Sequence, residues 1–455
     1  MTQYRRGNGQ GGAGSSGGGR RPQQRTMTEA ERRERARRRA EAERRKKQNR
    51  TIRIFTVGIV VLLIAVIVIV VVSCSNRKKP EPAGSSAAPV PQTATEEEST
   101  EAKRSEVELV AVGDVLMHTP LLNYADQGDG NYDFNHIFSV MKDDISKADI
   151  AVCNQETPID TTIPADGGIE FIFNTPGAIG DAEINAGFDI VQQASNHSYD
   201  EGSDGILHTI DYWKTKADQA TMIGLNESQE ARDEITYYEK NGIKFGLLNY
   251  TYGLNGFTLP EDKDYLVTII DDDHKEMIEN DIREAKENAD FVIVFPHWGV
   301  EDQWPDPTDF QVEWAKIFAD AGADLIIGAH PHVCEKIEWV TAADGRKTLC
   351  YYSLGNYASN QQETPEVLGG MAKVKIVKEN GETKIDESAT GVVPIVTHNV
   401  NLGDFTNEVV CYKLSDYTEE LASQHDIVTN GRDDFSVERL NEIAKEDFGD
   451  WIISY

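Results

Sequence analysis

The chain has 455 residues, with 45 Lys and Arg against 77 Asp and Glu, which gives a formal net charge of −32. This charge is unevenly divided: residues 1–53 hold 17 basic and 5 acidic residues, whereas the rest of the chain holds 28 basic and 72 acidic ones. An acidic body excludes general nucleic-acid binding, which depends on Lys and Arg side chains that neutralise phosphates.

Residues 1–53 form a basic tail without an apolar stripe, and we predict that this tail stays in the cytoplasm. Residues 54–72 carry no charge, and a helix of this length spans about 28 Å, close to the thickness of a hydrocarbon core. The pattern predicts one uncleaved membrane anchor, with the C-terminal body outside the cell. The alternative is a lipoprotein signal that ends at Cys74, but the region before the apolar run is long for a signal peptide.

Residues 73–106 are rich in Pro, Ser, Thr, Ala and Glu, which predicts a flexible linker. From residue 107 short apolar runs alternate with amphipathic segments, and this alternation predicts an α/β domain over residues 107–397. The expected strands are residues 107–112, 150–153, 190–193, 244–249, 291–295 and 325–327. The expected helices are residues 135–147, 177–186, 203–216, 273–288 and 309–321.

After residue 333 the pattern changes to strand, turn and strand, with a hairpin turn at residues 343–345 and a further strand at residues 371–377. Cys334 and Cys350 lie on the two arms of this hairpin. A disulfide between them is permitted outside the cell, and buried free thiols are the alternative. Residues 398–455 are acidic and less regular, so we interpret them as an appendage.

Polar motifs follow several expected strands, and open α/β sheets bind ligands at the carboxyl ends of their strands. If these strands share a sheet, one crevice collects the side chains of Asp114, Glu156, Asn196, His197, His297, His330 and His332. A mixed set of oxygen and imidazole ligands suits Zn, Mn or Fe. Each motif alone is equally compatible with a polar turn or a packed histidine. The agreement of five motifs with five strand ends is what favours a metal site.

Taken in order, the motifs AVGDVLMH, NQE, ASNHSYDEG, PHWGVE, GAHPHV and YSLGNY resemble those of the CapA-type poly-γ-glutamate capsule biosynthesis proteins. This family lies in the metallo-dependent phosphatase superfamily, and its members are commonly tethered to the outside of the membrane. The resemblance covers residues 106–396. It implies a four-layer α/β/β/α sandwich whose loops hold two divalent metal ions.

The resemblance also implies a role for each motif residue. The metal ligands would be Asp114 on the first metal, Glu156 on both, Asn196, His297 and His330 on the second, and His332 on the first. His197 would be the general acid, and Asp200 would orient it or raise its pKa. Two bound metals would activate a bridging water and neutralise charge on the attacked phosphoryl or carbonyl centre.

The sequence departs from the superfamily at two positions. Leu116 stands where a His ligand is usual, and Glu156 stands where an Asp is usual. The first metal site is therefore weak, empty, or completed by water or by His118. His118 is equally well explained as a loop histidine, and we also expect it to line the crevice as a substrate contact.

Three further residues are expected to line the crevice. Trp298 and Glu301 follow the strand that ends near His297 and would contact substrate; the alternatives are a packing aromatic and a carboxylate at a helix start. Asn356 would supply a polar contact from the hairpin side. Residues 398–455 fall outside the resemblance, and we expect the metal site to survive truncation after Thr397.

Three functions remain open. The first is a cell-surface role in the biosynthesis of poly-γ-glutamate or a related capsule polymer, beside membrane synthase or exporter subunits. There the protein would hold, transfer or trim the polymer, the last two by acting on γ-glutamyl amide bonds. The second is a metallophosphoesterase acting on a phosphate ester, and the third is a non-catalytic scaffold. Because the acidic body repels a polyanion, bound divalent cations would have to offset that repulsion in the first case.

Overall fold

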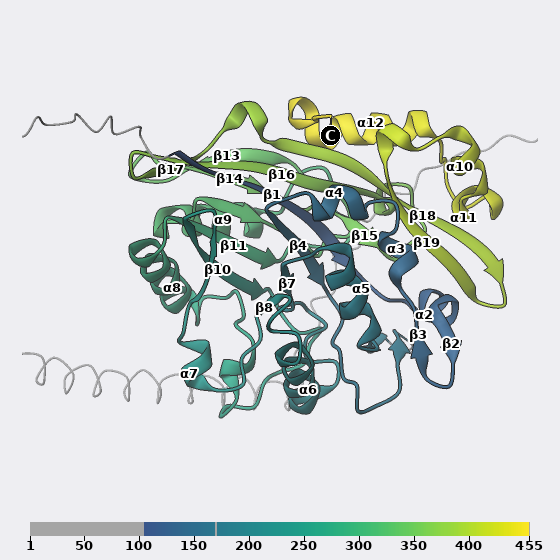
Figure 1. Ribbon diagram of the computed structural model, residues 1–455, viewed down its shortest axis with the longest axis horizontal. Coiled ribbons are helices and arrows are strands. Elements are labelled where there is room, and N and C mark those ends of the chain that lie inside the picture. Colours follow the sequence, from purple (N-terminus) through teal and green to yellow (C-terminus); the bar gives the residue numbers. More distant parts are fainter. Residues whose placement is uncertain (1–103, 169–170, 455) are drawn as a thin grey trace, which may run out of the picture. The chain divides into compact units, whose positions relative to one another are not determined.

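The computed structural model describes residues 104–168 and 171–454 (Figure 1). The basic tail, the predicted anchor at residues 54–72, Cys74 and the linker up to residue 103 lie outside the described residues. Within the described part of the chain, no helix is both long enough and apolar enough to cross a membrane. The described residues all belong to one compact unit.

The larger sheet has nine strands, which are β1 (Arg104–Val115), β4 (Ile150–Gln155), β7 (Ile190–Gln192), β8 (Thr221–Ile223), β15 (Asn356–Ala358), β16 (Leu368–Glu379), β17 (Glu382–Ile385), β18 (Gly391–Gly403) and β19 (Thr406–Lys413). Their order is β19-β18-β16-β1-β4-β7-β8, with β15 beside β1 and β17 beside β16. Strands β1, β4, β7 and β8 run parallel to one another, whereas β16, β18 and β19 pair antiparallel.

The smaller sheet has six strands, which are β9 (Thr236–Lys240), β10 (Ile243–Thr251), β11 (Phe291–His297), β12 (Leu325–Ile327), β13 (Ile337–Thr341) and β14 (Lys347–Tyr351). Their order is β13-β14-β12-β11-β10-β9, and β10, β11, β12 and β14 are parallel. Two short hairpins stand apart from both sheets, β2 (Asp126–Gly128) with β3 (Asn131–Tyr132) and β5 (Asp166–Gly167) with β6 (Phe173–Asn174).

The α-helices of the described residues are α2 (Thr119–Ala125), α3 (Asn135–Phe138), α4 (Lys142–Ser146), α5 (Ala178–Ala186), α6 (Gly202–Lys214), α7 (Gln229–Arg232), α8 (Lys275–Asn288), α9 (Asp309–Ala321), α10 (Glu419–Gln424), α11 (Asp426–Thr429) and α12 (Val437–Phe448). The expected strands all overlap observed ones. The expected helix at residues 135–147 is divided into α3 and α4 by a turn. The other expected helices overlap α5, α6, α8 and α9.

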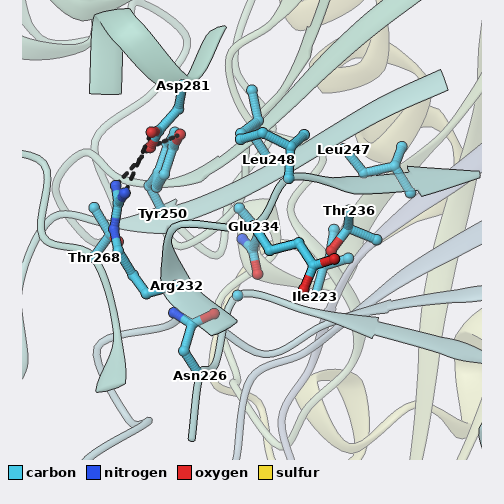
Figure 2. A pocket seen from close by; sticks show the side chains of 13 residues that line it. Ile223, Asn226, Arg232, Glu234, Thr236, Leu247, Leu248, Tyr250, Thr268 and Asp281 are labelled. Atoms are coloured by element: carbon cyan, nitrogen blue, oxygen red, sulfur yellow. Dashed lines mark hydrogen bonds and ion pairs between the residues drawn. The ribbon is translucent and has the colours of Figure 1, made fainter. Parts of the chain in front are cut away.

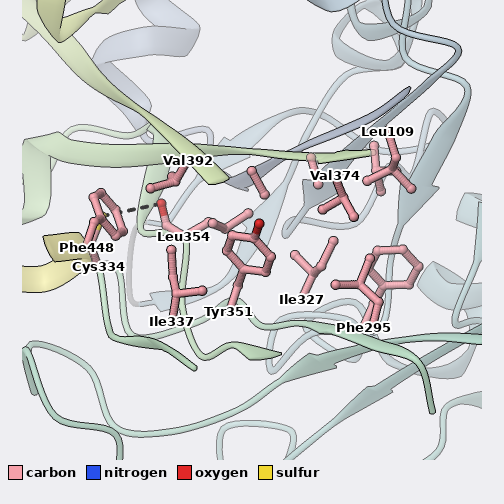
Figure 3. Close-up of a cluster of buried hydrophobic side chains, with 14 of the residues drawn as sticks. Leu109, Phe295, Ile327, Cys334, Ile337, Tyr351, Leu354, Val374, Val392 and Phe448 are labelled. Carbon is pink, nitrogen blue, oxygen red and sulfur yellow. Dashed lines mark hydrogen bonds between the residues drawn. The ribbon is translucent and has the colours of Figure 1, made fainter. Parts of the chain in front are cut away.

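Three apolar cores define the layers of the domain. Leu109 of β1 and Phe295 of β11 meet in the core between the two sheets, which Figure 3 shows. The neighbouring Val110 points the other way, into a core covered by α3 and α5, because successive side chains of a strand alternate between faces. On the far side of the smaller sheet, Val294 packs against α8 and α9. The chain therefore builds helix, sheet, sheet and helix layers, which confirms the predicted α/β class and the implied four-layer order.

The C-terminal residues 398–455 differ from the expected appendage. Strand β18 continues to Gly403 and pairs with β19 along its length, so this segment supplies one edge of the larger sheet. Helix α12 buries Leu440 and Phe448 in the core between the sheets (Figure 3 shows Phe448). Glu438, Glu442 and Glu446 lie on the exposed face of α12, and these acidic residues conceal an amphipathic pattern in the sequence. The segment is thus an integral part of the domain.

The cysteines of the described residues are all free and buried. Cys334 lies in the core between the sheets, where its thiol donates to the Leu368 carbonyl oxygen at 3.3 Å. Cys350 lies in the core beneath α8 and α9. The two thiols occupy different layers, so of the two alternatives the structure supports buried free thiols.

Candidate metal centre

The predicted ligands follow strands that belong to two sheets. Asp114 lies near the end of β1, and Glu156 follows β4 directly, both in the larger sheet. His297 is the last residue of β11, and His330 follows β12, both in the smaller sheet. The single shared sheet considered from sequence is therefore not what forms the crevice. It forms where the carboxyl ends of strands from both sheets meet.

Three sets of side chains gather at this position. In each set, one ligand atom per residue lies within 4.8 Å of the others. The sets are Asp114, Glu156 and His332; Glu156, His297 and His330; and Glu301, His330 and His332. Glu156 belongs to the first two, which is the arrangement expected of a bridging carboxylate. Every member except Glu301 is buried.

The first set is held together by two asparagines. Asn154 Nδ2 donates to Asp114 Oδ1 at 2.6 Å, and His332 Nδ1 lies 3.2 Å from Asp114 Oδ2. Asn356 lies beside Asp114 in the β1–β15 pairing, and its Oδ1 is 3.1 Å from His332 Nδ1. Asn356 Nδ2 also donates to the His332 carbonyl oxygen at 3.1 Å. Asn356 is fully buried and therefore orients His332, in place of the substrate contact expected from sequence.

The second set centres on His297. Its Nε2 lies 2.7 Å from Asn196 Oδ1 and 3.6 Å from Glu156 Oε1, so Asn196 joins this set as predicted. His330 and His332 have φ angles of +102° and +60°. A side chain with a positive φ is strained by about 1 kcal/mol or more, and such strain concentrates at functional sites.

Several atoms of the centre are buried without a hydrogen-bond partner among the described residues. They include both carboxylate oxygens of Glu156 and Nδ1 of His330. Burying an unpaired polar group costs about 1–3 kcal/mol, and a carboxylate costs more. A divalent cation satisfies such oxygen and imidazole atoms directly, so the residues present fit a metal centre.

The charges of the centre are set by burial and by neighbouring groups. Burial alone would raise the pKa of Glu156, but the nearby His332 and His297 hold this pKa below its ordinary value. Burial opposes the charge of His332, yet Glu156 and Asp114 raise the His332 pKa to about 10. Burial and the neighbouring imidazoles lower the pKa of His330 well below its ordinary value. Without a metal the site therefore presents an ionised Glu156 and a neutral His330, the forms that bind metals, beside a protonated His332 that has to release its proton when a cation binds.

A cavity of about 350 Å³ opens beside the first set. Its lining consists of Leu116, His118, Phe171, Phe173, His197, Asn255, Glu301, His332 and Gln361. His197 Nδ1 lies 2.8 Å from Asp200 Oδ2, and this oxygen also accepts the Phe173 backbone N–H at 2.8 Å. The predicted His197–Asp200 pair therefore exists, and its histidine lines the cavity.

His118 lines the cavity as a predicted contact residue. Burial lowers its pKa to about 4, and its Nδ1 accepts the Asn360 backbone N–H at 3.1 Å. His118 belongs to none of the three ligand sets of the described residues, so the structure does not support it as the group that completes the first metal.

Trp298 does not line the crevice. Its side chain is fully buried, and its indole stacks on Phe318 and Tyr352 in the core beneath α8 and α9. Its Nε1 donates to the Tyr352 carbonyl oxygen at 2.9 Å. The packing alternative is therefore the one observed, because Trp298 continues the face of β11 that carries Val294.

Two asparagines were not among the predicted site residues. Asn154 stands in the NQE motif, in which a role was predicted only for Glu156. Asn255 follows β10 in a loop, and its Nδ2 lies 3.3 Å from His197 Nδ1 while its Oδ1 accepts from Asn196 Nδ2 at 3.0 Å. No sequence pattern marks Asn255, because its place depends on how the loop folds back onto the site.

A second cavity lies between the two sheets' edges, near β8, β9 and β10, and has a volume of about 50 Å³. Figure 2 shows Arg232 on its wall, paired with Asp281 at 2.5 Å, and Tyr250 donating to the same carboxylate at 3.1 Å. The charge of Arg232 is thus neutralised within the protein. None of the predicted site residues lines this cavity, and its volume leaves room for little more than water.

Known proteins resemble this chain in sequence. The family described as "Bacterial capsule synthesis protein PGA_cap" matches residues 108–361. The "PGA biosynthesis protein CapA" of Bacillus subtilis is 32% identical over 46% of this chain and 51% of its own. The "Capsule biosynthesis protein CapA" of Bacillus anthracis is 28% identical over 63% of this chain and 66% of its own. The match thus spans about half the length of the first relative and just under two thirds of the second.

A solved structure, that of the calcineurin-like phosphoesterase YfkN from Bacillus subtilis, covers 75% of this chain and 98% of its own, with 14% identity and a TM-score of 0.37. A likeness of that degree carries no functional conclusion. The family match, in contrast, covers more than half of the chain and contains every ligand of the metal centre. This chain belongs to the bacterial capsule synthesis protein family PGA_cap.

Proposed function

We propose that this protein is a metal-dependent hydrolase or transferase that acts on an anionic capsule polymer such as poly-γ-glutamate outside the cell. In this proposal residues 54–72 anchor it in the membrane beside the synthase or exporter subunits. Membership of the capsule synthesis family and the names of the two relatives support the pathway. The observation that carries the chemistry is Glu156, whose two unpartnered buried oxygens lie between two ligand sets.

The described residues provide a set of ligands for each of two cations. Asp114, Glu156 and His332 would hold one, while Glu156, His297, His330 and Asn196 would hold the other. Bound divalent cations lower the pKa of water and neutralise negative charge that develops at an attacked carbonyl or phosphoryl group. Asn154 and Asn356 fix the orientation of Asp114 and His332 through the hydrogen bonds described above, which keeps the ligands in place before substrate arrives.

The proton transfer falls to His197. Asp200 lies 2.8 Å from His197 Nδ1 and holds the ring, so Nε2 is the nitrogen available to a leaving group in the cavity. For a γ-glutamyl amide, the group that leaves is an amine and requires one proton. Asn255, 3.3 Å from the same Nδ1, restricts the ring from the other side.

The composition of the cavity indicates how a polyanion would be held. None of the residues that line it in the described part of the chain is Lys or Arg, and Glu301 adds a negative charge. Lys and Arg side chains of the described residues are therefore not available to hold the polymer in this cavity, and His332 is engaged as a metal ligand in the proposal. Attraction has to come from bound cations, so polymer binding should require metal.

The metal content of the purified full-length chain tests this function, with wild type beside His330→Ala. His208→Ala is the matched control, because His208 lies on α6 and pairs with Asp160 outside the centre. After supply of Mn and Zn, we expect about two metal ions per chain in wild type and in the control, and fewer in His330→Ala. We also expect release of new amine ends from poly-γ-glutamate to fall in parallel.

The rival activity is measured on the same samples with p-nitrophenyl phosphate. Metal-dependent hydrolysis of this ester without cleavage or transfer of γ-glutamyl bonds would replace the polymer by a phosphate ester as substrate. A folded wild-type chain that takes up no metal would overturn the proposal as a whole.

A further inference from the structure

The two cation positions of the proposed centre have unequal numbers of protein ligands. Glu156, His297, His330 and Asn196 surround the second position, which gives it four side chains. Only Asp114, Glu156 and His332 surround the first. The nearby Leu116, which lines the adjoining cavity, offers no ligand atom. The first position is therefore one protein ligand short on its cavity side.

Glu301 lies on that open side. One of its carboxylate oxygens is within 4.8 Å of a ring nitrogen of His332 and of His330. His332 is thus shared by two sets, with Asp114 and Glu156 on its buried side and Glu301 on its cavity side. Its Nδ1 faces Asn356 Oδ1, whereas its Nε2 lies 3.7 Å from Glu156 Oε1 and is left for a cation.

The backbone holds the Glu301 loop against the loop that carries the two histidines. On one side of Glu301, the Trp298 N–H donates to the Ala329 carbonyl oxygen at 3.0 Å. On the other side, the Asp302 N–H donates to the Pro331 carbonyl oxygen at 3.0 Å. Gly299 permits this path, because its φ is +103° and a Cβ there would lie 2.9 Å from the Gln311 side chain. These ties place Glu301 opposite His330 and His332.

A second observation points to a ligand at the same place. His330 is 1% exposed, and its Nδ1 has no hydrogen-bond partner among the described residues. Both oxygens of Glu156 lack a hydrogen-bond partner among the described residues as well. Polar atoms without a hydrogen-bond partner therefore belong to two residues of the centre, His330 and Glu156, and Glu301 lies within 4.8 Å of a ring nitrogen of His330.

We infer that Glu301 becomes the fourth protein ligand of the cation held by Asp114, Glu156 and His332, by turning its exposed carboxylate from its place beside His330 and His332 toward that cation, and that it is not only a contact for substrate. This inference rests on the proposed metal centre. It makes the first position rich in oxygen, with three carboxylates and one imidazole, whereas the second has two imidazoles. Such a set favours Mn²⁺ or Fe²⁺ over Zn²⁺ at the first position.

Titration of the metal-free full-length chain with Mn²⁺ tests the inference, with free Mn²⁺ measured by electron paramagnetic resonance. The variant is Glu301→Gln, which keeps the shape of the side chain. The matched control is Glu313→Gln, which removes one exposed carboxylate from α9. We expect wild type and the control to bind two Mn²⁺ per chain. In Glu301→Gln, one Mn²⁺ should bind with wild-type affinity and the other at least about tenfold more weakly.

Two Mn²⁺ bound by Glu301→Gln with unchanged affinities would overturn the inference and leave Glu301 as a substrate contact. Binding of at most one Mn²⁺ by wild type would overturn it too, since no first cation would exist. The proposed reaction is tested separately. If Glu301→Gln loses one Mn²⁺ but the wild-type chain leaves the polymer unchanged, Glu301 is a metal ligand and the proposed hydrolase or transferase activity is rejected. An unchanged midpoint of thermal unfolding for the metal-free variant shows that it is folded.

Discussion

Two groups of buried carboxylates in this domain differ in what surrounds them. Glu156 lies among imidazoles, which hold its pKa below the ordinary value despite complete burial. No cationic side chain among the described residues stabilises the ionised form of Glu335 or of Asp447, and burial raises both pKa values to about 8. Among the described residues, the side chain that donates a hydrogen bond to Glu335 is that of Gln311, from Nε2 to Oε2 at 2.5 Å.

The difference shows that a buried carboxyl group is ionised, and so able to bind a cation, only when neighbouring groups stabilise its charge. Glu335 is only three positions from His332 in the sequence, yet it keeps its proton at neutral pH because nothing nearby compensates its charge. Glu156 stays ionised because His332 and His297 share its enclosure. Glu156 is therefore ready to accept a cation, while the carboxyl group of Glu335 stays protonated in the folded chain.

The largest effect is expected from truncation after Thr397, which removes Asp447 but none of the metal ligands. The cut deletes β19 and α12, whose Leu440, Ile443 and Phe448 are fully buried. Loss of each large buried side chain costs about 2–5 kcal/mol, and the total approaches the 5–15 kcal/mol that holds a domain together. We expect the truncated chain to be unfolded by circular dichroism and to bind no metal.

The opposite expectation, drawn from the acidic sequence, was a metal site that survives the cut. A truncated chain that keeps two metal ions and a cooperative unfolding transition would restore the appendage interpretation. It would also show that the metal centre around Glu156 folds independently of the segment that contains Asp447.

Glu156→Gln should have the next largest effect, and it acts on the first group alone. The amide keeps the shape of the side chain but removes the charge shared by both ligand sets. We expect both metal ions to be lost and the reaction rate to fall about 10³-fold or more, since metal and positioned water act together. Elemental analysis and the rate of γ-glutamyl cleavage measure this. Two metal ions retained in Glu156→Gln would exclude Glu156 as the bridge.

Glu335→Gln should change the pH dependence of stability without changing the metal. The folded-state pKa is raised, so the unfolded chain ionises first and stability falls as pH rises from about 4.5 to about 8. The amide cannot ionise, so the slope of unfolding free energy against pH should become shallower by up to about 1.4 kcal/mol per pH unit. Urea unfolding at pH 5, 6, 7 and 8 measures the slope. Identical slopes in both proteins would show that Glu335 is ionised in the folded state.

Much of the fold and of the centre could be predicted because both depend on local pattern. Alternating apolar runs locate β1, β4 and β11, and polar motifs at strand ends locate Asp114 and Glu156. The parallel direction of the strands then brings those ends together. The contacts of Asn255 and Asn356 could not be assigned in this way. The contact of Asn255 with His197 depends on how its loop folds, and that of Asn356 with His332 depends on the pairing of β15 with β1.

Two errors had a signal that was present in the sequence. Along β11, Val292 and Val294 face the helices, so the same alternation places Trp298 on that side and His297 on the other. In residues 437–448 the apolar positions Leu440, Ile443 and Ala444 repeat at helical spacing beneath the acidic face. In both segments the periodicity of the apolar positions indicates the buried face correctly, whereas the chemical character of a single residue does not.

Trp298→Phe should have the smallest effect, and it separates packing from substrate contact beside the first group. The substitution removes the indole N–H bond to the Tyr352 carbonyl oxygen and part of the stacking on Phe318. We expect a loss of about 1–3 kcal/mol in the free energy of unfolding, because a buried carbonyl is left without a partner. The metal content and KM for polymer should stay within about twofold of wild type, since Trp298 faces away from the cavity. His118→Gln is the counterpart on the cavity wall, where KM should rise with little change in stability. A raised KM and unchanged stability in Trp298→Phe would return this residue to the substrate site.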